Sequence, residues 1–495
     1  EKLTKFTEHK VKKRHHLIQL PGLPKLNEWD FKGVLLFRAW KGIGKTDTIG
    51  APFMKAKQNL GLTLATCHRT GLTAELSRKL GLANYQKITD VQQVIGLACC
   101  CPSLTKDKFA SFTDNTDYLF IDEIAQTLDF LKSKQCSTEK YDNNDVYEKL
   151  KQIVANAKCI IGADAELNDR VIEFIERARP NERFKIYDID ENHANKLKYD
   201  FERANKYDAP RKNIKYIIGD DSIGTAYGDM CNRIKEGQNI WVAMESEDKA
   251  NTLGKFLKHI CPEVELIVVH AKNKDNKKQK AFMANVDEAS KKYQVVIHSP
   301  FISSGVSVVH NTGEHFNHTY FVGGGHVITP SVASQMLARV RYVNDYTLVL
   351  QRNNTTLNVR EARARIIGKE QASILDGNYQ TASEFDEFVA QIEQDEETAK
   401  ADFINGLLWL MKAEGHKVTK FEHHYEPIDK HIAEIKEQHR EEWIKMLLEA
   451  PELEASEYHD LKRDGEKTLS NAAMLEKYEI MSFFNISSLT KQDIE

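Results

Sequence analysis

The sequence has none of the features that mark a membrane, secreted or strongly charged protein. No apolar run approaches the roughly 18 residues that cross a bilayer, so the sequence predicts no transmembrane helix. The formal net charge is only −4, so any nucleic-acid site has to be a local patch. No signal peptide is recognisable, and because the chain begins with Glu1 we expect it to be a piece excised from a longer polypeptide.

Zinc-binding patterns are absent as well. The chain has eight cysteines, three of them adjacent at Cys99–Cys101, but no Cys-x-x-Cys pair. Neighbouring cysteines rarely bridge each other, so reduced thiols are the simpler interpretation. Reduced thiols predict a location inside a cell: the cytoplasm, or the nucleus if the source is a eukaryotic virus.

The length of 495 residues exceeds what one hydrophobic core supports, so we expect two or three domains. Basic residues crowd the first 16 positions, which suits a solvated arm or a nucleic-acid contact. Apolar runs then alternate twice with helical patterns, and helices follow alone after about residue 365. The predicted parts are a basic arm at 1–32, α/β domains at 33–205 and 206–365, and a helical region at 366–495.

The predicted strands are short and apolar, and helical stretches separate them. This alternation favours parallel sheets covered by helices on both faces, hence an α/β fold class. In the first domain the strands are Val34–Phe37, Leu62–Cys67, Tyr118–Ile121, Cys159–Gly162 and Phe184–Ile189. In the second they are Ile214–Ile218, Ile240–Met244, Leu266–His270, Gln294–His298, Thr319–Val322 and Thr347–Leu350.

A glycine loop follows the first predicted strand, where Ala39–Thr46 reads Ala-Trp-Lys-Gly-Ile-Gly-Lys-Thr. Small residues let backbone N–H groups surround phosphate oxygens, Lys45 supplies a point charge, and the Thr46 hydroxyl can bind Mg²⁺. Ala39 replaces the first glycine of the general pattern, a small-for-small change. The loop predicts nucleoside triphosphate binding through Gly42, Ile43, Gly44, Lys45 and Thr46.

Two acidic residues come after the predicted strand Tyr118–Ile121. Asp122 and Glu123 follow it directly, and the carboxyl end of a strand is where a parallel sheet presents ligand-binding groups. With the phosphate loop in the same sheet, Asp122 is predicted to hold Mg²⁺, usually through water. Glu123 is predicted to orient or deprotonate the attacking water.

An arginine pair lies late in the second predicted domain, within Gln335–Arg341, after a strand and the triplet Gly323–Gly325. Arginines on a partner domain can stabilise charge on a transferring phosphoryl group and couple domain closure to hydrolysis. A surface helix with salt-bridged arginines is the alternative. Because a phosphate site and a repeated α/β pattern accompany the pair, the sequence favours a catalytic role for Gln335, Arg339 and Arg341.

Together these motifs resemble those of superfamily 2 helicases, over roughly residues 34–350. They occur in that family's order: Ala39–Thr46 as motif I, Thr66–Arg69 as Ia, Asp122–Ala125 as II, Gly162–Ala165 as III, Val242–Ser246 as IV, Ser299–Ser307 as V and Gln335–Arg341 as VI. Within that group the chain is similar to the herpesvirus origin-binding protein. It also resembles the helicase domains of primase–helicase replication proteins of plasmids, phages and other mobile elements.

The resemblance implies two tandem RecA-like domains, ATP and Mg²⁺ as cofactors, and DNA unwinding in the replication of a mobile element. It implies single-stranded DNA as the main partner, held by its phosphates, with a primase domain or replication partner besides, and no membrane. The matching nucleic-acid positions are His68, Arg69, Ser103, Ser246 and Ser303, and Gly305 joins the nucleotide-binding set.

The chain departs from the family in three places. Motif II ends in Ile-Ala, motif V has Ser307 where many relatives have Asp, and no adenine-reading glutamine is clear upstream of motif I. Three alternatives stay open: an ATPase that remodels nucleic acid without separating strands, a non-enzymatic origin-binding scaffold, and a phosphate-loop kinase. The preference for DNA or RNA, the polarity and the oligomeric state are also open.

Overall fold

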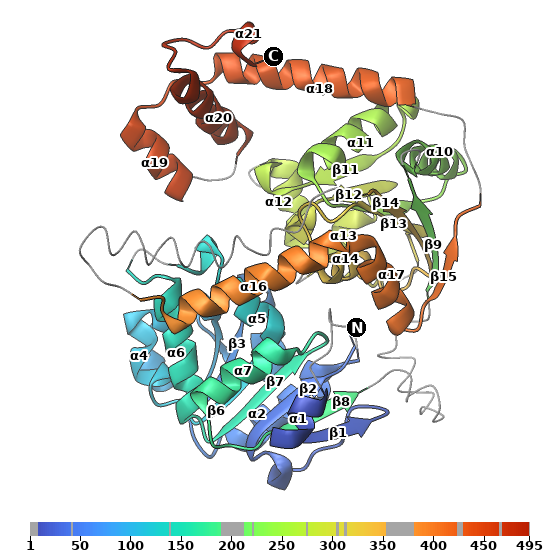
Figure 1. Ribbon diagram of the computed structural model, residues 1–495. Coiled ribbons are helices and arrows are strands. Elements are labelled where there is room, and N and C mark those ends of the chain that lie inside the picture. The colour runs from blue at the N-terminus through green and yellow to red at the C-terminus, as the bar shows by residue number, and fades with distance from the viewer. Residues whose placement is uncertain are drawn as a thin grey trace. The chain divides into compact units, whose positions relative to one another are not determined.

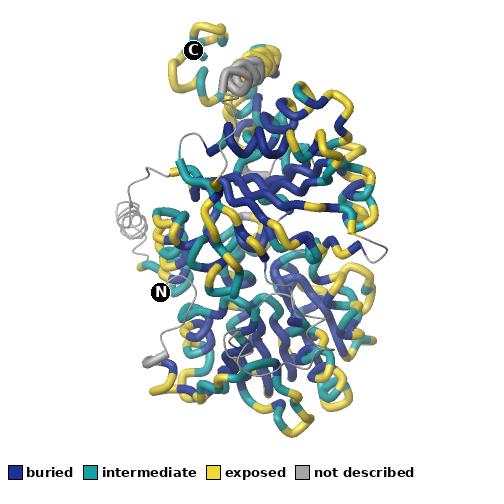
Figure 2. The backbone as a smooth tube through the Cα atoms, turned by 90° about the vertical axis from the view of Figure 1, so that its right-hand side faces the viewer, coloured by how far each residue is buried: buried dark blue, intermediate teal, exposed yellow. Residues whose placement is uncertain are grey.

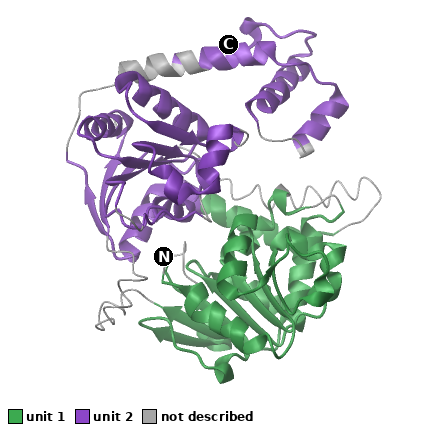
Figure 3. Ribbon diagram, turned by 180° about the vertical axis from the view of Figure 1, so that it is seen from behind, with its two compact units in different colours: residues 1–209, 357–398 green, residues 210–356, 399–495 purple. Residues whose placement is uncertain are grey.

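The computed structural model describes residues 8–40, 43–137, 140–189, 212–219, 222–273, 276–302, 306–310, 314–352, 381–422, 429–464 and 468–494. The chain divides into two compact units, coloured separately in Figure 3. Unit 1 comprises residues 1–209 and 357–398, and unit 2 comprises residues 210–356 and 399–495. Figure 1 labels the helices and strands of each unit.

Unit 1 is built on an eight-stranded sheet in which all paired strands run parallel. The strand order is β1-β8-β2-β7-β6-β3-β5-β4, and Figure 1 labels the first six of these strands. Parallel neighbours need a crossover, and helices between the strands supply it. The strands are β1 (His16–Leu20), β2 (Gly33–Arg38), β3 (Thr63–Cys67), β4 (Ala83–Asn84), β5 (Gly96–Cys100), β6 (Tyr118–Asp122), β7 (Cys159–Asp164) and β8 (Lys185–Ile189).

The inner strands of this sheet are buried on both faces, and they appear dark in Figure 2. Alternate residues of a strand point to opposite faces, so Leu35 and Leu36 of β2 enter different cores. Leu35 shares its core with α2 (Ala51–Lys57) and α3 (Thr70–Leu80). Leu36 shares its core with α4 (Asp107–Thr113), α5 (Ile124–Phe130), α6 (Asn143–Asn156), α7 (Asp169–Ala178) and α16 (Glu384–Ala401).

Unit 2 repeats the design with a seven-stranded sheet, again parallel throughout its described pairs. The order is β11-β12-β10-β13-β14-β9-β15. The strands are β9 (Asn213–Ile218), β10 (Ile240–Met244), β11 (Leu266–Val269), β12 (Val295–His298), β13 (His318–Gly323), β14 (Asp345–Leu350) and β15 (Lys417–Lys420).

Helices cover both faces of this second sheet. One core joins it to α10 (Ser222–Lys235) and α11 (Glu247–Ile260). The opposite core joins it to α12 (Lys277–Ala284), α13 (Val286–Ser290), α14 (Pro330–Leu337) and α17 (Phe403–Ala413). Among the described helices of the chain, none combines the length and the apolar character that crossing a membrane requires.

The C-terminal segments are divided between the units. Residues of α16 up to Thr398 belong to unit 1, where Phe388 and Ile392 enter the core and Arg170 of α7 pairs with Asp395. The helices after α17 belong to unit 2, where Leu447, Ala450 and Ala473 form a small core. They are α18 (Asp429–Glu449), α19 (Ala455–Asp464), α20 (Leu469–Phe484) and α21 (Lys491–Ile494).

The predicted α/β class, with two parallel sheets followed by mainly helical C-terminal segments, is confirmed. Every predicted strand is present within one or two residues of its expected bounds. Strands β1, β4, β5 and β15 were not predicted. In particular, the expectation that strands end after about residue 365 is wrong, because β15 adds an edge to the second sheet beside β9.

Candidate nucleotide site

The phosphate loop follows β2, as the sequence predicted. Gly44 has a φ of 84°, a left-handed conformation that glycine adopts at little cost, and the chain then enters a π-helical turn at Thr46–Gly50. The Lys45 ammonium donates hydrogen bonds to the carbonyl oxygens of Ala39 (2.8 Å) and Trp40 (3.1 Å). Ile43 is buried, whereas Gly42 lies outside the described residues. The lysine therefore spans its own loop, where a bound phosphate would lie.

Asp122 ends β6 beside this loop. The Thr46 hydroxyl lies 3.3 Å from its Oδ2 atom, so residues far apart in the sequence meet at the carboxyl edge of the sheet. Burial raises the pKa of Asp122 to about 6, and the positive charge of Lys45 acts in the opposite direction. A hydroxyl beside a carboxylate is an oxygen donor set that suits Mg²⁺, which binds through one or two protein groups, water and phosphate. The residues present therefore fit a magnesium site.

Glu123 occupies the corner between β6 and α5. Its φ of 48° and ψ of 52° are left-handed, an uncommon conformation for a non-glycine residue. The Nδ1 atom of His68 lies 3.9 Å from its Oε2 atom. Burial, with a contribution from Arg69, lowers the pKa of His68 to about 3, so the imidazole is neutral. About a third of the Glu123 side chain is exposed. This geometry leaves a carboxylate able to accept a proton from water.

Asp164, at the end of β7, connects the two nucleotide motifs. Its Oδ2 atom accepts a hydrogen bond from the backbone of Ala125 (2.8 Å), at the start of α5. Its carbonyl oxygen accepts one from Ala39 (3.1 Å), at the start of the phosphate loop. Its Oδ1 atom accepts a third from Glu166 (2.8 Å). One buried residue thus fixes the loop relative to the Asp122–Glu123 corner. Sequence reasoning placed it in a motif without a role.

The predicted nucleic-acid residues of unit 1 lie in different surroundings. His68 and Arg69 follow β3 at the same carboxyl edge as the loop, and Arg69 directly precedes α3. Burial lowers the pKa of Arg69. Ser103 lies in the 3₁₀ turn Cys101–Thr105 and is only 5% exposed. The adjacent cysteines Cys99–Cys101 are buried free thiols.

In unit 2 the predicted arginines differ in exposure. Arg339 is 7% exposed, and its guanidinium donates to the carbonyl oxygens of Gln335 (2.6 Å) and Val306 (3.0 Å). Arg341 is partly exposed and donates to the hydroxyl of Ser307 (3.1 Å). Gln335 is itself buried in α14. Arg339 is thus buried and bound to backbone carbonyl groups, whereas the side chain of Arg341 is more accessible.

Glu245 is a feature that sequence reasoning did not assign. It follows β10, is 2% exposed, and accepts four backbone hydrogen bonds. Oε2 accepts from Gly324 (2.6 Å) and Gly325 (3.2 Å), while Oε1 accepts from Val327 (2.7 Å) and Ile328 (3.4 Å). The loop needs glycine here, because a Cβ on Gly324 would lie 2.7 Å from a backbone oxygen. The only signal in the sequence is an acid directly after a buried strand.

The remaining predicted positions of unit 2 include one helix start. Ser246 precedes α11 and its side chain accepts from the backbone of Lys249 (3.5 Å). Ser303 and Gly305 lie outside the described residues. Within the described ranges, no group of three or more metal-ligating His, Cys, Asp or Glu side chains occurs.

No family model matches the chain. An uncharacterised protein of Picosynechococcus is 22% identical over 324 residues, covering 62% of this chain and 31% of that protein. An uncharacterised putative helicase, R8, of Acanthamoeba polyphaga mimivirus is 24% identical over 351 residues, covering 67% of this chain and 31% of that protein. The chain thus spans about a third of the length of these curated relatives.

Solved helicase structures are similar in part. The DEAD-box helicase Mss116 bound to single-stranded RNA and UDP-BeF aligns with a TM-score of 0.49 and 12% identity, covering 94% of each chain. The DUF1998 helicase MrfA bound to DNA aligns with a TM-score of 0.45 and 11% identity, covering 72% of this chain and 50% of MrfA. Likeness at this level establishes no activity, so the functional assignment depends on the geometry of the site.

Proposed function

We propose that this chain is an ATP-dependent helicase or translocase acting on nucleic acid. The observation that supports it most directly is the 3.3 Å approach of Thr46 to Asp122, with Lys45 and Glu123 adjoining them in sequence. Phosphate-binding, metal-binding and proton-accepting groups then converge at one edge of the sheet in unit 1, as hydrolysis of a nucleoside triphosphate requires.

Each group has one role in this proposal. Lys45 and the backbone of the loop bind the phosphates. Thr46 and Asp122 would hold Mg²⁺, which neutralises phosphate charge when bound. Glu123 orients the attacking water and accepts its proton at the partly exposed carboxylate. Asp164 keeps these groups in register through its backbone hydrogen bonds.

The two arginines of unit 2 have different roles in this proposal. We assign Arg341 to stabilising the charge of the transferring phosphoryl group, because its side chain is partly exposed. Arg339 is assigned to positioning, because its guanidinium is buried on the carbonyl oxygens of Gln335 and Val306. Gln335 supports that arrangement, and Gly305 completes the nucleotide-binding set.

The finer parts of the proposal rest on the sequence motifs. They assign single-stranded DNA as the substrate, held by His68, Arg69, Ser103, Ser246 and Ser303. They assign the chain to replication of a mobile element inside a cell, with kinship to origin-binding and primase-linked helicases and with a primase or other replication protein as partner.

A strand-displacement assay tests the proposal. A duplex with a single-stranded tail, one strand fluorescent, is incubated with the chain, ATP and Mg²⁺, and release of the labelled strand is followed. We expect release with wild type and none with Lys45→Ala. Hydrolysis stimulated by DNA without release indicates a remodelling ATPase. Phosphate transfer to a small acceptor instead of water would identify a kinase and overturn the proposal.

A further inference from the structure

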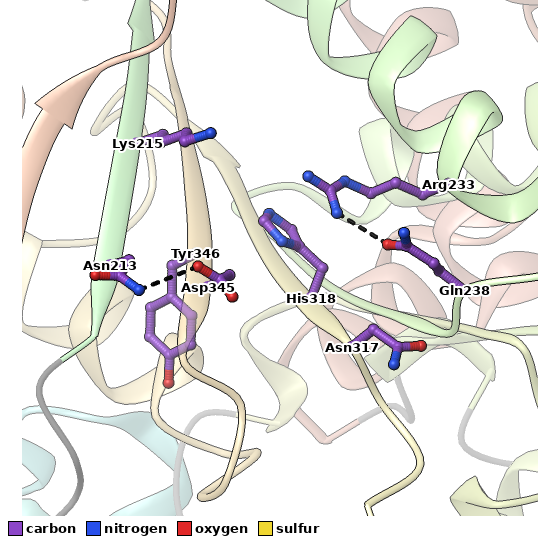
Figure 4. A pocket seen from close by; sticks show the side chains of 8 residues that line it. All are labelled: Asn213, Lys215, Arg233, Gln238, Asn317, His318, Asp345 and Tyr346. Carbon is purple, nitrogen blue, oxygen red and sulfur yellow. Dashed lines mark hydrogen bonds between the residues drawn. The ribbon is translucent and has the colours of Figure 1, made fainter. Parts of the chain in front are cut away.

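A second candidate site lies in unit 2, at the edge of the sheet opposite Glu245 and the glycine triplet. A cavity of about 380 Å³ opens there, at the amino ends of neighbouring strands (Figure 4). Asn213 and Lys215 of β9, Asp345 of β14, His318 of β13 and Arg233 of α10 line it. Asn213 pairs in register with Asp345, so these residues belong to adjacent strands. The proposed helicase chemistry uses none of them.

His318 has an unsatisfied ring nitrogen. The side chain is buried, with the residue 2% exposed, and its Nε2 atom lies 2.8 Å from the hydroxyl of Thr347. Its Nδ1 atom has no hydrogen-bond partner among the described residues. A buried polar atom without a partner costs about 1–3 kcal/mol. A ligand in the cavity would remove that cost.

The protonation of His318 indicates what the ligand must offer. Burial, with Arg233 and Lys215 nearby, lowers the pKa of His318 well below its usual value, so the ring is neutral. A neutral imidazole has one donor and one acceptor nitrogen. If Nε2 accepts from the Thr347 hydroxyl, Nδ1 carries the hydrogen and requires an acceptor.

The charged residues occupy different parts of the lining. Lys215 makes no ion pair with any described residue. Arg233 donates to Asp229 (3.1 Å) and Gln238 (2.9 Å). In Figure 4 the His318 ring stands between Lys215 and Arg233, whereas Asp345 lies beside Asn213, which donates to it (3.3 Å). The cavity thus has a cationic part with N–H donors and a part with a carboxylate acceptor.

Buried polar groups beneath the cavity hold Arg233 in position. Tyr320 donates to Asp229, and both are buried between α10 and the sheet. Burying ionisable groups stabilises a fold no better than apolar residues of the same size. Asp229 fixes Arg233 in place, so this arrangement acts as a support for the cation in the lining.

We propose that this cavity binds a small oxyanion that carries an O–H group, of which hydrogen phosphate is the simplest. Lys215 and Arg233 balance its charge, the His318 Nδ1–H donates to one oxygen, and Asp345 accepts from the O–H. Sulfate has the same shape but carries no proton at neutral pH. A sulfate oxygen beside the Asp345 carboxylate would therefore bring two acceptors together with no hydrogen between them.

Calorimetry of the full chain tests this, using Lys45→Ala as background so that the phosphate loop contributes no heat. Inorganic phosphate is titrated at constant ionic strength, with sulfate as the comparison. We expect sulfate to bind about tenfold more weakly, Lys215→Ala to weaken phosphate about tenfold, and Asp345→Asn to abolish the preference for phosphate. Lys235→Ala, an exposed lysine on α10 outside the lining, is the matched control and should change affinity less than about twofold.

Both substituted positions are exposed, so the variants should fold, and their thermal midpoints verify this. Titration with glycerol 3-phosphate distinguishes a phosphate ester from free phosphate as the ligand. Tighter binding than phosphate indicates an ester, and weaker binding indicates the free ion. The proposal is overturned if phosphate produces no heat of binding, if Lys235→Ala is as harmful as Lys215→Ala, or if phosphate and sulfate bind equally to the parent chain.

Discussion

The Oδ2 atom of Asp164 accepts a hydrogen bond from the backbone N–H of Ala125 at 2.8 Å. This contact fixes the start of α5 directly after Asp122 and Glu123, while the backbone of Asp164 holds the phosphate loop at Ala39. In the proposed function, the geometry of the candidate nucleotide site therefore depends on a residue that has no direct role in binding phosphate or activating water.

Replacing Asp164 tests that dependence. Asp164→Asn keeps one acceptor oxygen and loses the other, so either Ala125 or Glu166 loses its partner. We expect the free energy of unfolding to fall by about 1–3 kcal/mol and ATP hydrolysis to fall with it. Urea unfolding measures the first effect. Glu173→Gln, an exposed carboxylate on α7, is the control, and equal losses in both variants would contradict this role.

Glu245 should have a comparable role in unit 2. Glu245→Gln leaves one oxygen for the four backbone donors of residues 324–328, so we expect a loss of about 2–3 kcal/mol in the stability of unit 2. Faster proteolytic cleavage at this loop should accompany it. The exposed Glu265→Gln serves as control, and a loop equally resistant in Glu245→Gln would show that the carboxylate is not needed.

Helix α16 should stabilise unit 1 although it follows most of unit 2 in sequence. Ile392 is fully buried in the core of unit 1, so Ile392→Ala should cost about 2–5 kcal/mol in urea unfolding. The adjacent Gln391 is exposed, and Gln391→Ala should cost under about 0.5 kcal/mol. Indistinguishable variants would mean that α16 does not pack on unit 1 in solution.

Alanine substitutions of the two arginines should differ in their effects on stability and on hydrolysis. Arg339→Ala removes a buried guanidinium from two carbonyl oxygens, so the urea midpoint should fall together with hydrolysis. Arg341→Ala should leave the midpoint nearly unchanged and lower kcat about 10³-fold or more, as for other arginines that stabilise phosphoryl transfer. Unchanged kcat in folded Arg341→Ala would remove this residue from the mechanism.

The sequence predicted those strands whose residues are continuously apolar. Ile240–Met244 matches β10 at both ends, because both its faces are buried. The missed strands have weaker signals. Lys417–Lys420 is a short edge strand with mostly exposed residues, and His16–Leu20 is a partly exposed edge strand that follows a basic run. Gly96–Cys100 is a fully buried strand, and only its two terminal cysteines, as part of Cys99–Cys101, entered the sequence prediction.

The candidate nucleotide site could be proposed from the sequence because its residues follow strands at fixed offsets. Lys45, Thr46 and Asp122 could be assigned from local patterns, and the sheet then brings Thr46 and Asp122 together. The role of Glu245 could not be assigned in this way, because its partner Gly324 lies 79 residues away and any acid after a strand gives the same local signal. The burial of Arg339 also depends on distant backbone, which no local pattern specifies.

Steady-state ATP hydrolysis with and without single-stranded DNA tests the central claim most directly. Wild type, Glu123→Gln and the control Glu173→Gln are compared at saturating ATP and Mg²⁺. We expect DNA to stimulate wild type and Glu173→Gln alike, and Glu123→Gln to lose at least about 10²-fold in kcat, because it lacks the proton acceptor. Hydrolysis that neither DNA nor RNA changes, or that persists in Glu123→Gln, would contradict a nucleic-acid motor with its catalytic base at this position.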